Sequence, residues 1–182
     1  MSRFPVLEPD QWPEQVVPLL EEVKTDFGFV PNLEKVLAAA PAALEGYVAL
    51  WNLISRTGFS ALEQQVICQE INRQHGCHYC QAHHDILLRQ AGGDAELRSC
   101  VLSGEPAEDA RLQALRDMVT ALLQQRGHVQ EAQVESFIAA GYEPARVLDL
   151  VLILACKVIS NYTNHLADTP LESFMQPAGG DK

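Results

Sequence analysis

The sequence predicts an all-α protein, a compact bundle of about eight helices joined by short loops. Apolar residues recur at intervals of three and four along most of the chain, which is the spacing of one buried helix face. Prolines and glycines divide the chain into segments of helical length. The alternation typical of half-buried strands and the Asn-Gly signal of a hairpin do not occur in the sequence. The pattern therefore favours helices throughout.

The individual helices are predicted from their apolar stripes and from the residues that cap them. One helix begins after Ser60, because Glu63 lies three residues later as in a capping box, and it ends near Gly76. Asp94 caps a later short helix, and Gly141 ends the last but one. The helical segments expected in order cover residues 15–25, 33–37, 44–54, 60–76, 77–91, 94–102, 112–123, 134–138 and 144–167.

Three parts of the chain are distinguished by composition. Residues 1–30 contain four prolines, so an irregular N-terminal arm with one short helix is expected there. Residues 31–172 form the helical domain, and no linker or block of charge divides it. Residues 173–182 are expected to be a flexible tail. The chain therefore reads as one domain with two extensions.

Charge and hydropathy limit the classes of partner. The 182 residues include 24 acidic and 13 basic ones, a formal net charge of −11, which repels nucleic acids and anionic membrane surfaces. The most apolar run, 147–159, contains Asp149 and Lys157 and is shorter than the roughly 20 residues that span a bilayer. The N-terminus lacks the apolar run of a signal peptide. We expect a cytoplasmic protein that binds neither nucleic acid nor membrane.

Residues that can do chemistry are concentrated in one stretch, 75–84, which reads His-Gly-Cys-His-Tyr-Cys-Gln-Ala-His-His. If Cys77 lies in the first turn of the helix after Gly76, Cys80 lies on the same face, about 5–6 Å away between Cβ atoms. Such a pair can open and close as a disulfide after slight adjustment. Free N–H groups and positive potential at a helix start also lower a thiol pKa. The spacing predicts a redox-active cysteine pair.

Two histidines one turn further along can activate these thiols. His84 lies four residues after Cys80, and His83 lies three after it. A thiol within reach of a neutral base is the usual arrangement for a cysteine nucleophile. The helix dipole favours Cys77 as the nucleophile, whereas the spacing of the base favours Cys80, so the residues alone leave both possible.

Two other interpretations compete with redox chemistry. The two cysteines can be small core residues that are close by chance. Alternatively Cys77, Cys80 and His84, with His75 or His78, supply ligand types that suit zinc. Zinc ligands usually come from two separated pairs, and no second Cys-x-x-Cys follows in the sequence. We therefore expect no metal and no other cofactor.

The remaining cysteines and histidines are weaker candidates. Cys68, Cys100 and Cys156 each stand alone on apolar helical faces, where a cysteine packs as a small apolar residue. His128 follows Gly127 in an expected loop. His165 can approach the site from the last helix, but a position at a helix end or an interface is the better interpretation.

Several stretches together match one known family: 30–32, 40–41, 60–63, 76–84, Gly92, 161–165 and 169–171. Over residues 30–172 the sequence resembles the alkylhydroperoxidase D-like, peroxidase-related branch of the carboxymuconolactone decarboxylase superfamily. The resemblance implies an all-helical fold with the Cys-x-x-Cys at the start of a central helix. It also implies homo-oligomers (dimer, trimer or hexamer) built by packing apolar helices across subunits.

The resemblance further implies a thiol peroxidase. Cys80 would attack a hydroperoxide, and Cys77 would resolve the resulting sulfenic acid as a disulfide. A dithiol donor, lipoyl-type or thioredoxin-like, would then reduce the disulfide by exchange. In this scheme His84 is the proton relay.

Two departures from the family pattern concern that relay. The family often has a glutamate twelve residues before the first cysteine, where this chain has Gln65, whose amide cannot take a proton at neutral pH. Glu63 and Glu70 point roughly 160° and 140° away from Gln65 at about 100° per residue, so neither replaces it. Tyr79 stands where some members have a histidine. These departures predict a weakened peroxidase. Gln65 favours, as an alternative, a redox-sensing or scaffold protein without turnover. A carboxymuconolactone decarboxylase-type enzyme is a further alternative, although that reaction does not need the cysteine pair.

Overall fold

The computed structural model describes residues 3–176, whose regular structure is helical, with no strand among them. The all-α prediction is confirmed: these residues form nine α-helices, one at each of the helical segments expected, together with three short 3-10 turns. The α-helices are α1 (Val17–Phe27), α2 (Asn32–Leu37), α3 (Pro41–Ile54), α4 (Ala61–His75), α5 (His78–Gln90), α6 (Ala95–Ser103), α7 (Ala110–Gln124), α8 (Glu131–Ala139) and α9 (Arg146–Ala167).

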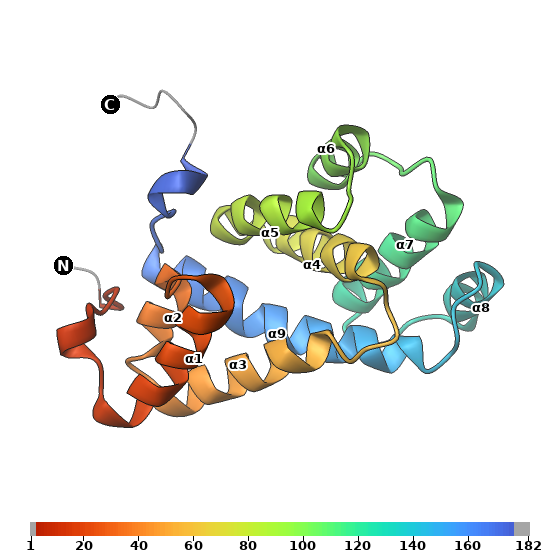
Figure 1. The fold of residues 1–182 in the computed structure, drawn as a ribbon. Helices are drawn as coiled ribbons and strands as arrows, with labels where there is room; N and C mark the ends of the chain where they lie inside the picture. The colour runs from red at the N-terminus through yellow and green to blue at the C-terminus, as the bar shows by residue number, and fades with distance from the viewer. Residues whose placement is uncertain (1–2, 177–182) are drawn as a thin grey trace.

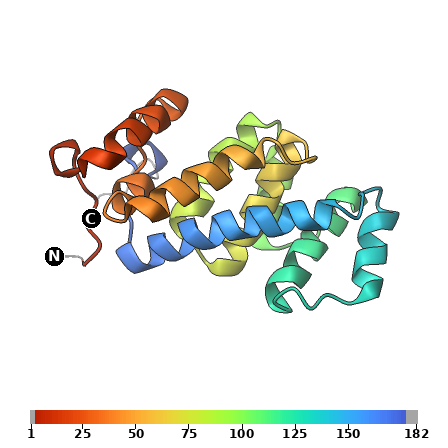
Figure 2. The same ribbon diagram turned by 90° about the horizontal axis from the view of Figure 1, so that it is seen from below.

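Helices α4 and α9 organise the bundle. α4 packs against α5, α6, α7 and α9, while α9 also packs against α2 and α3 (Figure 1). Figure 2 shows α3 and α9 side by side over most of their length. Fully buried leucines and isoleucines fill the space between these helices, among them Leu44, Ile67, Leu115 and Ile153. The first and last thirds of the chain therefore meet on one side of α4 and α5.

Most helix boundaries lie within a few residues of those predicted, and the differences follow from prolines and caps. α1 begins at Val17, where Pro18 occupies the first turn and its missing N–H costs no hydrogen bond. The capping box before α4 is confirmed: the Ser60 hydroxyl accepts from Glu63 N, and the Glu63 carboxylate accepts from Ser60 N at 2.8 Å. A 3-10 turn, Ser173–Met175, lies in the expected tail, of which residues 177–182 are outside the described part of the chain.

One helix of the described residues, α9, is long and apolar enough by length and composition to cross a membrane. The core helix of a globular bundle passes the same test, and this helix packs against α2, α3, α4, α5 and α7. It also buries Lys157, Ser160, Asn161 and Asn164 among its neighbours. The feature is weak grounds for a membrane span.

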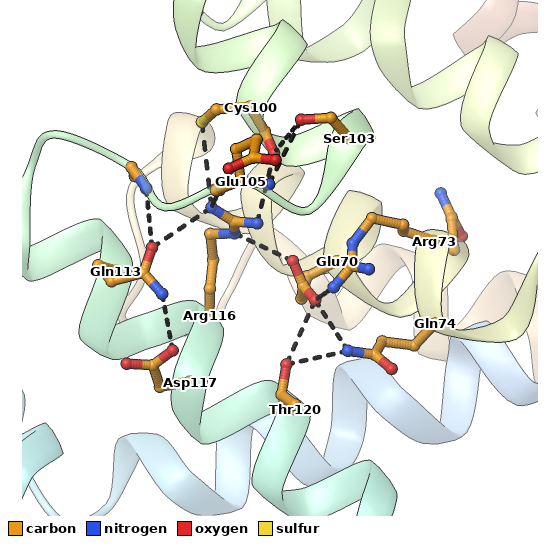
Figure 3. Close-up of polar contacts among 12 residues, drawn as sticks. Glu70, Arg73, Gln74, Cys100, Ser103, Glu105, Gln113, Arg116, Asp117 and Thr120 are labelled. Atoms are coloured by element: carbon orange, nitrogen blue, oxygen red, sulfur yellow. Dashed lines mark hydrogen bonds and ion pairs between the residues drawn. The ribbon is translucent and has the colours of Figure 1, made fainter.

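A buried ion pair fastens α7 to α4 on the side away from α3 (Figure 3). Arg116 donates from Nε to Glu70 Oε2 at 3.0 Å, and both side chains are almost fully buried. Arg73, Gln74 and Thr120 also donate to the Glu70 carboxylate. Burial raises the pKa of Glu70. The hydrogen bonds from the two arginines and Gln74, together with the charge of Arg116, lower it by more than burial raises it, so the net pKa lies below its ordinary value. Glu70 thus belongs to the scaffold.

Replacing Arg116 by Met is expected to destabilise the fold by about 3 kcal/mol, because breaking a buried pair leaves a poorly compensated charge. The measurement is urea unfolding at neutral pH. Since the folded pKa of Glu70 is lowered, its stabilisation is complete above its ordinary pKa of 4.5 and is lost as the pH falls through the folded pKa. The difference between variant and wild type should therefore shrink in acid.

The control for this prediction is Arg56→Met, since Arg56 is an exposed arginine beyond the end of α3. It should change the free energy of unfolding by less than about 0.5 kcal/mol. An Arg116 variant as stable as this control, at every pH, contradicts the assignment of the ion pair.

Candidate active site

The junction between α4 and α5 places the two cysteines. Gly76 ends α4 in the left-handed conformation, with φ of 66°, which glycine adopts without strain. The chain then turns at once into α5, with Cys77 as its N-cap residue and Cys80 in its first turn. Both are free thiols and are buried, at 1% and 3% exposure. The predicted pair at the start of a central helix is confirmed, with Cys77 one position earlier than expected.

The surroundings of the two sulfurs are unequal. Asn164 Nδ2 donates to Cys80 Sγ at 3.2 Å, and Asn161 approaches the same sulfur from α9. Burial raises the pKa of Cys80, but the Cys77 thiol, the charge of Lys157 and the two amides lower it to about 5. The pKa of Cys77 is raised instead, first by its hydrogen bond to Cys80 and then by burial. At neutral pH the thiolate is therefore Cys80, and Cys77 keeps its proton.

His84 is held by hydrogen bonds at both ring nitrogens. Gln65 Oε1 lies 2.8 Å from Nδ1, and Lys157 Nζ lies 2.8 Å from Nε2. Burial and then the charge of Lys157 push the pKa of His84 well below its ordinary value. The ring is therefore neutral, with Nδ1–H donating to Gln65 and Nε2 accepting from the ammonium group. The spacing suggested direct contact between His84 and Cys80. In the structure, Lys157 interacts with both: its ammonium group donates to His84 Nε2, and its charge lowers the pKa of Cys80.

Lys157 is the site residue that sequence reasoning missed. It lies in the middle of α9, at 1% exposure, and it was counted only as a break in an apolar run. Burial lowers the pKa of Lys157, but the negative charge of Cys80 is the largest opposing cause, and the net pKa lies above its ordinary value. A lysine is almost never fully buried unless it is paired. The position of Lys157 within an apolar run therefore could have indicated a buried, negatively charged partner.

Two predicted supporting residues lie beside the site. His83 packs edge-on against Phe27 at 6.0 Å, and burial followed by the charge of Lys157 lowers its pKa to about 4. Tyr79 donates its hydroxyl to Glu172 Oε1 at 2.6 Å and so ties α5 to the C-terminal segment. His83 also lies beside the His84 ring, at 6.0 Å between ring centroids.

Three other predicted supporting residues do not meet the site. Glu63 caps α4 and accepts from the Tyr142 hydroxyl at 2.9 Å, while Glu70 belongs to the ion pair with Arg116. His165 is exposed on α9, as its interpretation as a helix-end residue implied. Its helical neighbours Asn161 and Asn164, from the same sequence motif, reach the sulfur instead.

The other cysteines and the possible metal ligands are also placed. Cys68 and Cys156 are fully buried in the core, and Cys100 is partly buried. His75 Nδ1 pairs with Asn161 Oδ1 at 2.8 Å. Within residues 3–176, no three His, Cys, Asp or Glu side chains converge in a way that could hold a metal ion. The described geometry offers no ligand set for the zinc alternative.

Replacing Lys157 by Met should raise the pKa of Cys80, because the buried thiolate loses its cation. The ultraviolet absorbance of the thiolate, followed against pH, is expected to titrate near pH 5 in the wild type and several units higher in the variant. Lys24→Met, which removes an exposed lysine of α1, should leave the midpoint in place. A variant at Lys157 with an unchanged midpoint would contradict the electrostatic role given to this amine.

Comparison with known proteins identifies the fold. No family model and no curated protein matches the sequence. A crystal structure of an alkylhydroperoxidase AhpD core, an uncharacterized peroxidase-related protein from Ralstonia eutropha JMP134, matches with a TM-score of 0.83 and 22% identity. The match covers 96% of this chain and 94% of that one.

Two further structures have the same arrangement. An uncharacterized peroxidase-related protein from Silicibacter sp. TM1040 matches with a TM-score of 0.79 and 20% identity, over 95% of this chain and 92% of that one. The debrominase Bmp8, crystallised as a C82A variant with 2,3,4-tribromopyrrole, matches with a TM-score of 0.76 and 16% identity, over 96% and 94%. The fold thus occurs in proteins named for different chemistry. This chain has the all-helical AhpD-like fold of the peroxidase-related proteins.

Proposed function

We propose that the protein is a thiol-dependent peroxidase, a disulfide oxidoreductase that reduces hydroperoxides through Cys80 and Cys77. The observation that carries this proposal is the asymmetry of the pair: a stabilised thiolate at Cys80 touches a protonated thiol at Cys77. A thiolate is the nucleophile that peroxides require, and a neighbouring thiol is what a sulfenic acid needs to form a disulfide.

The reaction follows from this asymmetry. The Cys80 thiolate attacks the terminal oxygen of ROOH, the O–O bond breaks, and the alkoxide leaves with the electron pair and takes up a proton. The Cys77 thiol then attacks the Cys80 sulfenic acid, forming the S–S bond and releasing water. A dithiol reductant, lipoyl-type or thioredoxin-like, restores both thiols by exchange.

Three residues support these steps. Lys157 stabilises the thiolate by its charge, and Asn164 fixes the sulfur by its amide. His84 holds the ammonium group of Lys157 in place by accepting its hydrogen bond at Nε2. Gln65 orients the imidazole, as an amide can do. Because Cys80 is only 3% exposed, small hydroperoxides should react faster than bulky ones.

The apolar surface of α9 supports a homo-oligomer as the working form. Leu148 is 72% exposed and Leu166 is 66% exposed, and Val151 and Tyr162 are also exposed. Large exposed apolar side chains on one helix often mark an interface between subunits. We place such an oligomer in the cytoplasm, where a dithiol reductant is maintained.

The test is hydroperoxide consumption in the presence of a dithiol donor. Cys80→Ser should abolish turnover, because the attacking sulfur is gone. Cys77→Ser should allow one equivalent of sulfenic acid to form at Cys80, trapped by a dimedone-type reagent, without disulfide formation. Cys100→Ser, at a partly buried cysteine of α6, is the matched control and should turn over normally. Persistence of full activity in Cys80→Ser would refute the proposal.

A second candidate is a redox sensor that oxidises without turnover. It is favoured by Gln65, whose amide cannot carry the proton that a glutamate would. Rapid oxidation of the pair without repeated cycles under excess dithiol would support this candidate, and sustained turnover at low peroxide would exclude it. Decarboxylation of a ring lactone needs neither sulfur, so it would not use the stabilised thiolate at Cys80.

A further inference from the structure

Several buried polar atoms around Cys80 have no hydrogen-bond partner. Of the five such side-chain atoms in the described residues, four belong to this region: Glu34 Oε2, Asn164 Oδ1, Thr169 Oγ1 and Glu172 Oε2. The first three of these side chains are at least nine-tenths buried. Unpaired buried polar atoms are rare in native proteins, and each needs a ligand, a water molecule or a reactive role. Their concentration here indicates a place for a small hydrogen-bonding molecule.

Hydrogen bonds and charge interactions connect the residues that carry these atoms to Cys80. The Asn164 amide touches Cys80 Sγ, and Thr169 N donates to Asn164 O at 3.2 Å. Glu172 accepts from Tyr79, the residue before Cys80. Glu34 interacts electrostatically with Glu172, Cys80 and Lys157. The residues that carry the unpaired atoms lie on α2, on α9 and in the segment after α9, and α9 packs against both α2 and α5. Tyr79 of α5 joins two of these parts, because its hydroxyl bonds to Leu33 N and to Glu172.

Glu34 stands out among them because it is an acid with a proton to give. Its side chain is 4% exposed in α2. Burial raises its pKa to about 8, helped by the negative charges of Glu172 and Cys80 and opposed by its own backbone and by Lys157. The carboxyl group is therefore protonated at neutral pH, and its unpaired oxygen is free to donate or accept. This acid has no place in the mechanism given above.

We propose that Glu34 is the acid that protonates the leaving oxygen when Cys80 attacks a hydroperoxide. This inference rests on the proposed function and supplies a proton source that Gln65 cannot provide. The proposal assigns the region of unpaired atoms to the hydroperoxide, with Asn164 Oδ1 as a further acceptor for its O–H group.

The step balances in atoms, electrons and charge. The Cys80 sulfur donates an electron pair to the terminal oxygen of the hydroperoxide, and the O–O bond breaks. The departing oxygen takes the proton from Glu34, giving Cys80 sulfenic acid, ROH and the Glu34 carboxylate. The Cys77 sulfur then attacks the sulfenic sulfur and forms the S–S bond. The displaced hydroxide takes up the Cys77 proton and leaves as water. Glu34 regains a proton when the dithiol donor reduces the disulfide and restores the Cys80 thiolate and the Cys77 thiol.

Conservation of buried charge favours this donor over a solvent proton. Before the step, the Lys157 ammonium faces the Cys80 thiolate; afterwards Cys80 is neutral and the negative charge is on Glu34, which also interacts with Lys157. The cation is compensated in both states. Leaving it unpaired in the interior would cost several kcal/mol. Moving a proton from Glu34 keeps the site neutral as the sulfur loses its charge.

A surface groove lies next to the segment that contains Glu34. A groove of about 400 Å³ lies between the N-terminal arm and α2, lined by Trp12, Phe29, Lys35 and Glu172 among others. Glu172 is half-buried there and bonds to Tyr79 on its inner side. Its charge also interacts with Glu34, so it joins the groove to the neighbourhood of that acid.

The test compares Glu34→Gln with the wild type in the reaction of fully reduced protein with hydrogen peroxide, before any dithiol is added. The rate constant for oxidation should fall about 100-fold, the order that general acid catalysis contributes. The wild-type rate should also decline above about pH 8, as Glu34 loses its proton, and this decline should be missing in the variant. Glu34→Asp, which keeps an acid, should recover part of the rate.

Other titrating groups near Glu34 must not produce the same decline. The groups that interact with it or with its neighbours from the surrounding elements are Glu172, Tyr47, Tyr79, Cys80, Cys156 and Lys157. The tyrosines, Cys156 and Lys157 have their pKa values raised above their ordinary ones, and the pKa of Cys80 is lowered to about 5. The thiolate titration of Cys80 near pH 5 should be unchanged in Glu34→Gln, which separates loss of the acid from damage to the site.

Glu45→Gln, at an exposed glutamate of α3, is the control and should react as the wild type does. A Glu34→Gln protein with the wild-type rate and pH profile overturns this inference but leaves the proposed function standing. The same conclusion follows if the rate of the wild type does not decline near pH 8, and this measurement does not depend on whether the variant folds. A wild type that does not react with hydrogen peroxide at all would instead count against the proposed function.

Discussion

The buried ammonium group of Lys157 is the constraint on which the site depends. A charge this far from water is tolerated only with a partner of opposite sign and with its N–H groups satisfied. The structure supplies an anion at Cys80 and an acceptor at His84 Nε2. The same interaction that makes the cation tolerable also keeps the sulfur in its thiolate form. Burial of the amine and ionisation of the thiol are thus two results of one buried pair.

The amide of Gln65 suits a site that contains a buried ammonium group. A glutamate at this position would hold a negative charge against His84 Nδ1 and favour the imidazolium form. An imidazolium would then face the ammonium of Lys157 at 2.8 Å, with no lone pair to accept from it. A neutral amide instead keeps the ring neutral and its Nε2 available. Gln65 and Lys157 are therefore mutually consistent, and the acid that the relay lacks comes from elsewhere in our proposal.

The scaffold holds this arrangement through ordinary packing and capping. Gly76 ends α4 and fixes the start of α5, so the positions of both sulfurs are set by backbone geometry. Helix α9 contributes Lys157, Asn161 and Asn164 from one face, because these residues are three or four positions apart. The likeness to peroxidase-related proteins and to a debrominase describes this scaffold. Chemistry is a property of the side chains placed on it.

Local patterns in the sequence determined the all-α class, most helix limits, the capping box at Ser60 and the position of Cys77 and Cys80 at a helix start, because these depend on residues a few positions apart. Only the tertiary structure decided which sulfur is ionised. Lys157 and Asn164 lie more than seventy positions from Cys80 along the chain, and Glu34 lies almost fifty before it, so no local spacing could show that they surround it. Electrostatic interactions act through space, and the packing of α2, α5 and α9 brought these charges together.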